Sequence, residues 1–144
     1  FEVLPVVDEV PVICGIHGSD PRRRMWHFLG QVKDMGFSGV NNFPTHSIVD
    51  GKFRQILEET GMSVQKEVDM TGLARRMDLF SIVYVGSPEE ARDMAEVGAD
   101  AIIAHVGTTI GGSIGVVDAT MTLEEAAVEA AVEAGVAQSS IVEM

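Results

Sequence analysis

A histidine next to a glycine-rich segment is the feature of the chain best suited to chemistry. His105 lies near the end of the apolar segment 101–106, which is predicted to be a buried strand. A histidine in this position can protonate or polarise a substrate, because its charge changes near neutral pH. A histidine whose ring is satisfied by backbone groups is the alternative. We take His105 as the leading catalytic candidate.

The segment after His105, residues 107–115, alternates glycines with hydroxyl residues. Glycine lets backbone amides approach an anion closely, so Gly111, Gly112 and Ser113 are candidate anion-binding residues. The segment lacks the terminal lysine of a P-loop, and a flexible lid is the alternative interpretation.

Further polar residues follow the other predicted strands. Asp20 follows the first strand, where it is either a helix cap or a strand-end carboxylate. Asn41 and Asn42 end the second strand, and the period of two points them to opposite faces, so only one can point into a site. Three carboxylates lie in the crossover to the third strand, where one could bind a divalent cation or act as a base, although solvated helix carboxylates are more common: Glu58, Glu59 and Glu67.

The elements that must position these residues alternate in type. Apolar runs predict strands over 12–16, 37–43, 80–85 and 101–106. Between and after them, helical periodicity and capping patterns predict helices from Pro21 to Gly36, from Phe53 to Gly61, over 67–77, from Ser87 to Gly98, and from Thr122 to Gly135. Trp26 and the methionines at helical spacing are predicted to be core.

Strands that alternate with helices predict parallel, right-handed crossovers, and therefore a doubly wound sheet or a (β/α)8 barrel. Polar residues end each of the predicted strands, and a barrel gathers its site from several strand ends, whereas a doubly wound sheet uses one switch point. The pattern favours an α/β fold of the TIM-barrel type, with residues 1–144 forming a single domain of about four β/α units.

The composition limits the partners and the cellular compartment that we expect for the chain. The net charge is −12 and the only basic run is Arg22, Arg23 and Arg24, which we interpret as a solvated helix face, so nucleic acid is not an expected partner. The single cysteine, Cys14, excludes a disulfide framework and favours a reducing compartment. No apolar stretch reaches the roughly 18 residues of a membrane span. We therefore expect a cytoplasmic protein that does not enter a membrane.

The chain resembles the phosphoenolpyruvate hydrolase-like family over roughly Val3 to Thr122. These TIM-barrel proteins are also described as resembling indole-glycerol-phosphate synthase, and a related barrel forms the C-terminal part of plant proteins that confer resistance to a tobamovirus. The resemblance rests on segments that are not simple propensity patterns: Asp20-Pro21, Asn42-Phe43-Pro44-Thr45, Leu57-Glu58-Glu59-Thr60-Gly61-Met62, Glu67-Val68, Met94-Ala95-Glu96, Gly98-Ala99-Asp100, Ala104-His105 and Gly111-Gly112-Ser113-Ile114-Gly115.

This resemblance implies an enzyme of the phosphoenolpyruvate/pyruvate type, hydrolase or lyase, that cleaves a P–O or C–C bond of a small phosphorylated or carboxylated acid. Mg²⁺ is the candidate metal, and the family pattern favours Asn42 over Asn41 in the barrel mouth. The alternative is a non-catalytic barrel that binds a partner protein or a signalling ligand. The implied catalytic residues are His105, Asp20 and Glu59, and the implied substrate-binding residues are Asn42, Thr45, Tyr84, Gly111, Gly112 and Ser113.

Two departures from the family bear on the fold. In the family, two strand units precede the position of Phe1, and a later strand ends in a His-Gly-Gly-Pro segment that nothing here matches. Four strands cannot close an eight-stranded barrel, because an open half exposes two edges and an apolar face. Either the chain is a portion of a longer one, or half-barrels pair, which predicts a homo-oligomer.

Overall fold

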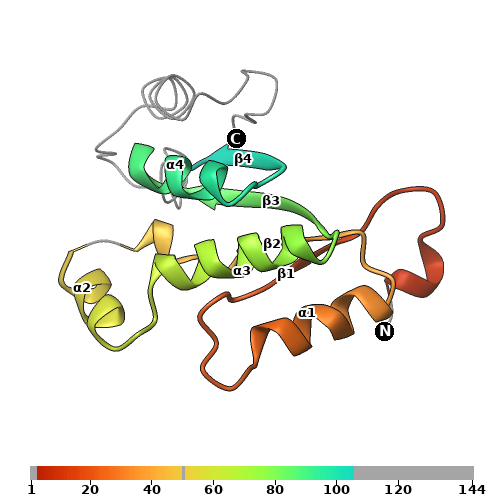
Figure 1. The fold of residues 1–144 in the computed structure, drawn as a ribbon, viewed down its shortest axis with the longest axis horizontal. Helices are drawn as coiled ribbons and strands as arrows, with labels where there is room; N and C mark the ends of the chain where they lie inside the picture. Colours follow the sequence, from red (N-terminus) through yellow and green to blue (C-terminus); the bar gives the residue numbers. More distant parts are fainter. Residues whose placement is uncertain (1–2, 50, 106–144) are drawn as a thin grey trace, which may run out of the picture.

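The computed structural model describes residues 3–49 and 51–105 (Figure 1). The glycine-rich segment with Gly111, Gly112 and Ser113 lies outside the described residues, as does the helix predicted to begin at Thr122.

The centre of the fold is a parallel sheet of four strands in the order β1-β2-β3-β4. The strands are β1 (Ile13–Gly15), β2 (Gly39–Asn41), β3 (Phe80–Val85) and β4 (Ala101–Ala104). Each strand pairs with the next one along the chain, whereas a doubly wound sheet reverses its strand order at a switch point. The observed order is compatible with part of a TIM-barrel sheet, and the four strands lie within the ranges expected from the sequence.

Helices connect the strands and cover one face of the sheet. They are α1 (Met25–Asp34), α2 (Gly51–Glu59), α3 (Val64–Arg76) and α4 (Pro88–Glu96), with short 3-10 turns at Leu4–Val6 and His46–Ile48. In Figure 1, α1, α3 and α4 lie side by side in front of the strands. The start of α4 is the one predicted, because the Ser87 hydroxyl accepts a hydrogen bond from the Glu90 amide and Pro88 occupies the first turn.

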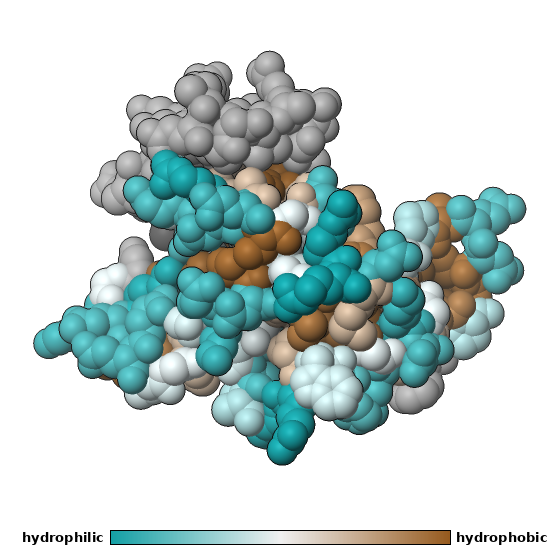
Figure 2. Space-filling model, in the orientation of Figure 1, coloured by the Kyte–Doolittle hydropathy of each residue, from teal (hydrophilic) through white to brown (hydrophobic). Residues whose placement is uncertain are grey.

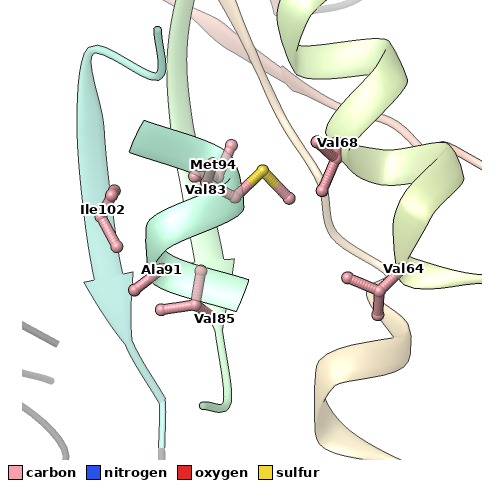
Figure 3. Packing of buried hydrophobic residues seen from close by; sticks show 7 residues of the cluster. All are labelled: Val64, Val68, Val83, Val85, Ala91, Met94 and Ile102. Carbon is pink, nitrogen blue, oxygen red and sulfur yellow. The ribbon is translucent and has the colours of Figure 1, made fainter. Parts of the chain in front are cut away.

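The hydrophobic core lies between the sheet and this helix layer. Alternate residues of a strand point to opposite faces, so Val83 and Val85 of β3 and Ile102 of β4 share the helix-facing side. They pack against Val64 and Val68 of α3 and Ala91 and Met94 of α4 (Figure 3). A second cluster joins α1 to β2 and α3, with the buried members Ile16, Leu29, Val32, Val40, Met70, Ala74 and Leu79.

Three local expectations for the segment around α1 are wrong. The helix begins at Met25, not Pro21, because Asp20 and Pro21 instead start a turn closed by a bond from the Arg23 amide to the Asp20 carbonyl (3.2 Å). Asp and Pro are as well suited to the first two positions of such a turn as to a helix start. The basic run therefore lies in the loop before α1, not on a helix face. Trp26 is not core, since 61% of it is exposed.

The surface of this face is mainly hydrophilic. In Figure 2 the outer sides of the helices are teal, and hydrophobic residues show between them and on the N-terminal segment at the right. On that segment Val3, Val6 and Val10 are exposed. Within residues 3–49 and 51–105, no helix is long and apolar enough to cross a bilayer.

Candidate functional site

The candidate site lies at the edge of the sheet where the parallel strands end. His17 follows β1, the loop 42–47 follows β2, Tyr84 is near the end of β3, and His105 follows β4. Carboxyl ends of parallel strands meet at one edge, so residues far apart in the sequence come together there. The N-terminal turn of α3 joins them, because this helix runs back antiparallel to the strands.

Glu67, in the first turn of α3, is the centre of the polar contacts. It is 0% exposed. One carboxylate oxygen, Oε2, accepts hydrogen bonds from Asn42 Nδ2 (2.6 Å) and Thr45 Oγ1 (2.7 Å). The other, Oε1, accepts one from the backbone amide of His46 (2.8 Å). A single buried carboxylate therefore fixes the loop that follows β2 against the N-terminus of α3, where the helix dipole favours a negative group.

The ring of His46 adds a second titratable group to this buried cluster. Its Nδ1 lies 3.1 Å from Glu67 Oε1, and only 5% of its side chain is exposed. Burial raises the pKa of Glu67, against the lowering effect of its three hydrogen-bond donors. Burial is also the main cause that lowers the pKa of His46, and the nearby His17 and Arg54 add to it. Both shifts favour the neutral form of the group that they affect.

Close backbone packing holds the same loop in place. A Cβ atom at Gly15 would lie 2.9 Å from the Phe43 carbonyl oxygen, and one at Gly18 would lie 2.9 Å from the Glu67 Cα. At Gly86 a Cβ would lie 2.6 Å from the Ser47 carbonyl oxygen. Gly15 and Gly86, at the ends of β1 and β3, thus let the loop 42–47 approach the sheet closely, and Gly18 lets α3 approach the loop after β1.

The expected orientation of the two asparagines is reversed. Asn42 is 0% exposed and points to the helix side, where its amide oxygen accepts from the Tyr84 amide (2.7 Å) and its Nδ2 also reaches the Tyr84 carbonyl (2.9 Å). Asn41 pairs in register with Ile82, so it lies on the opposite face, the face of Tyr84. Asn42 and Thr45 thus stabilise the loop 42–47 from the helix side of the sheet. Their contact with substrate remains a prediction.

Tyr84 and His105, two of the predicted site residues, lie in contact with each other. Their ring centroids are 5.4 Å apart in an edge-on arrangement, and the Phe43 ring contacts Tyr84 at 5.9 Å. The His105 amide donates to the Val85 carbonyl (2.9 Å), which extends the β3–β4 pairing by one residue and fixes the backbone of His105. Three aromatic rings thus form a row along the ends of β2, β3 and β4.

The two predicted catalytic carboxylates, Asp20 and Glu59, bind close neighbours in the chain. Asp20 accepts from the Arg22 amide (2.9 Å) and forms ion pairs with Arg22 and Arg23; the hydrogen bonds with Arg22 lower its pKa. It therefore closes its own loop. Glu59 is exposed at the end of α2 and accepts from Gln55 Nε2 (2.8 Å), one helical turn away. The structure does not bring Glu59 together with Tyr84 or His105, and its catalytic role remains a prediction.

The residues that the structure describes provide no ligand set for the predicted Mg²⁺. Among residues 3–49 and 51–105, no group of three or more His, Cys, Asp or Glu side chains is arranged to hold a metal ion.

The sequence predicted an acidic group of Glu58, Glu59 and Glu67 and favoured Glu59 as catalytic, whereas Glu67 is the member that the fold buries. The sequence does indicate that Glu67 is buried, because this residue falls on the apolar stripe of its helix, beside Val68 and one turn from Val64 and Thr71. Glu59, in contrast, follows Gln55 by four residues, the spacing of a surface pair.

The fold and the site define an α/β protein with a sequentially ordered parallel sheet and polar residues at its carboxyl edge. A family model described as phosphoenolpyruvate hydrolase-like matches residues 1–142. The chain belongs to this family, as its motifs suggested.

Curated relatives of the chain come from a plant and from a bacterium. The ToMV resistance protein Tm-1(GCR237) and the ToMV susceptible protein tm-1(GCR26) of Solanum lycopersicum are each 54% identical over 124 residues, or 86% of this chain and 16% of the relative. The putative transcriptional regulatory protein y4pA of Sinorhizobium fredii is 36% identical over 114 residues, or 79% of this chain and 19% of the relative. The chain thus spans about a sixth of the length of the tomato proteins that it matches.

Proposed function

We propose that the chain forms one wall of a (β/α)8 barrel enzyme that cleaves a P–O or C–C bond of a small phosphorylated or carboxylated acid. Family membership supports the substrate class, since the family is described as phosphoenolpyruvate hydrolase-like. The sequential parallel sheet supports the barrel. The observation that carries the proposal is the contact of Tyr84 with His105 at the carboxyl edge, where barrel enzymes bind their substrates.

His105 is the acid or base of this proposal. Cleavage of the P–O bond of phosphoenolpyruvate, or of a C–C bond that leaves its electrons next to a carbonyl group, gives an enolate, and a histidine can donate the proton that the enolate needs. The edge-on contact with Tyr84 restricts the plane of the His105 ring, and the bond from its own amide to the Val85 carbonyl restricts its backbone. A catalytic group held in this way loses little entropy when substrate binds. Asp20 and Glu59 are not used, because their side chains are bound to neighbours in the β1–α1 loop and on α2.

The test is a screen of phosphoenolpyruvate and oxo-acids for release of phosphate or pyruvate. We expect turnover that His105→Ala abolishes and that His105→Phe, which keeps an aromatic ring against Tyr84, does not restore. His27→Ala is the matched control, because His27 is an exposed histidine on α1 whose ring contacts Trp26. Absence of turnover, or turnover that survives both changes at His105, would refute the proposal.

A second candidate is a non-catalytic barrel that binds a partner protein. It is favoured by the names of the relatives, which record resistance or susceptibility to a tobamovirus and transcriptional regulation, not an enzymatic reaction. A pull-down with saturating small acids distinguishes the two candidates. Binding of a partner that is unchanged by the acids and by His105→Ala favours the binding function. Displacement of the partner by the acids favours a shared small-molecule site.

A further inference from the structure

A serine and a histidine in the loop after β1 form a contact that the proposed function does not use. Ser19 Oγ lies 3.2 Å from His17 Nε2. The other ring nitrogen, His17 Nδ1, lies 3.1 Å from the carbonyl oxygen of Pro44, a residue 27 positions further along the chain. The ring edge of His17 also contacts the ring of His46, with centroids 5.0 Å apart. The histidine is thus held from three sides.

These contacts fix the proton positions of a neutral His17. A carbonyl oxygen can only accept, so Nδ1 carries the hydrogen and donates it to Pro44. The Nε2 atom then has a free lone pair, and the Ser19 hydroxyl donates to it. This is the arrangement of an activated nucleophile: a hydroxyl bonded to a base whose far side is oriented by a third group.

Other serines in the described part of the chain make different contacts. The Ser47 hydroxyl bonds to Thr45 Oγ1, Ser81 Oγ donates to the Asp100 carboxylate, and Ser87 Oγ caps α4. None of these partners is a histidine nitrogen. Ser19 lies in the loop that follows β1, and it is 7% exposed.

We propose that Ser19 is a nucleophile activated by His17, and that it accepts the phosphoryl group of a phosphate ester of a small acid. The substrate class rests on the proposed function; the nucleophile does not. The Ser19 Oγ–P bond forms as the P–O bond to the organic group breaks, and the hydroxyl proton moves to His17 Nε2. His17 then returns that proton to the leaving oxygen. Water next attacks the phosphoserine, His17 takes a proton from the water, and Ser19 regains it as inorganic phosphate leaves.

A fluorophosphonate probe tests the nucleophile without any natural substrate, because it phosphonylates serines that have an adjacent base. The intact protein is labelled, digested and mapped by mass spectrometry. We expect the label on Ser19 and its loss in Ser19→Ala. His17→Asn keeps a side-chain amide that can donate to Pro44 but removes the base, and we expect labelling to slow by about a hundredfold or more. Ser38→Ala is the control, because Ser38 is exposed and would be labelled if access alone decided the reaction.

Circular dichroism checks that each variant is folded, and His17→Gln replaces His17→Asn if that variant unfolds. A folded protein that is not labelled at Ser19, or one labelled equally fast without the His17 base, overturns the proposal. Labelling of Ser19 in a protein that turns over no phosphoenolpyruvate or oxo-acid supports the nucleophile and refutes the proposed function. The two conclusions are therefore tested separately.

Discussion

Replacing Glu67 with alanine removes the buried acceptor on which the loop after β2 depends. Asn42 Nδ2 retains the Tyr84 carbonyl (2.9 Å), and the Thr45 hydroxyl retains the Ser47 hydroxyl (3.1 Å), so both keep a partner. The His46 amide, which donates to Glu67 Oε1 at 2.8 Å, loses its acceptor.

The expected cost follows from these contacts. A buried donor without a partner costs about 1–3 kcal/mol. The one methylene group lost from the buried side chain adds roughly 0.8 kcal/mol. Relief from burying the carboxylate offsets part of this sum, since desolvation is the main cause that raises its pKa. We expect a loss of about 2–3 kcal/mol in the free energy of unfolding, within the range for breaking a buried polar network.

Urea denaturation followed by far-UV circular dichroism measures this loss. With a denaturant slope of about 2 kcal/mol per molar, the midpoint falls by about 1–2 M at an unchanged slope. Glu59→Ala is the control: Glu59 is exposed and bonded to Gln55, so its removal changes stability by less than about 0.5 kcal/mol. Glu67→Gln, which keeps the size of the side chain but turns one acceptor into a donor, falls between them. Equal midpoints for Glu67→Ala and Glu59→Ala would show that the buried contacts do not stabilise the fold.

Three further predictions use the same assay. The pKa of His46 is lowered in the folded protein, so its contribution to stability is present above the ordinary pKa of 6.5 and is lost as the pH falls through the folded pKa. His46→Gln is therefore expected to lose less stability than the wild-type protein when the pH falls from 7.5 to 5.5. Equal losses in the two proteins would contradict this. Gly18→Ala destabilises by about 1–3 kcal/mol, because its Cβ would lie 2.9 Å from the backbone of α3. Gly30→Ala, within α1, stabilises by up to about 1 kcal/mol, because its Cβ would lie 3.8 Å from Met77 Cε, an ordinary contact distance. Effects of the same sign would refute the packing argument. Ser87→Ala removes the cap of α4 and is expected to lower the free energy of unfolding by about 1 kcal/mol. Ser63→Ala, at the start of α3 where the hydroxyl makes no cap bond, is expected to change stability little. Equal losses would exclude capping as the cause.

Local signals in the sequence were sufficient for most elements. The third strand, 80–85, has the predicted bounds because a continuous apolar run ends at a glycine and a helix cap. The cap itself was readable, since Ser87, Pro88 and Glu90 stand at the positions that begin a helix. These features depend on neighbours within a few residues, and tertiary contacts did not override them.

The same kind of local signal failed at Asp20 and Trp26. An Asp-Pro pair fits both a helix start and a turn, and the arginines that bind Asp20 favour the turn. Trp26 has helical spacing but lies outside the buried stripe of α1, which contains Leu29 and Val32. Periodicity indicates that a helix has an apolar face, but the packing against the sheet decides which residues that face buries.

The sequence alone determined the family, the alternation of strands and helices, and the approximate place of His105 beside the ends of other strands. The tertiary structure decided which carboxylate is buried, which asparagine faces the helices, and that His17 connects Ser19 to Pro44. The physical reason is the sequence distance of the partners. Glu67 meets Asn42 across 25 residues and His17 meets Pro44 across 27, so these contacts form only when parallel strands bring their ends together.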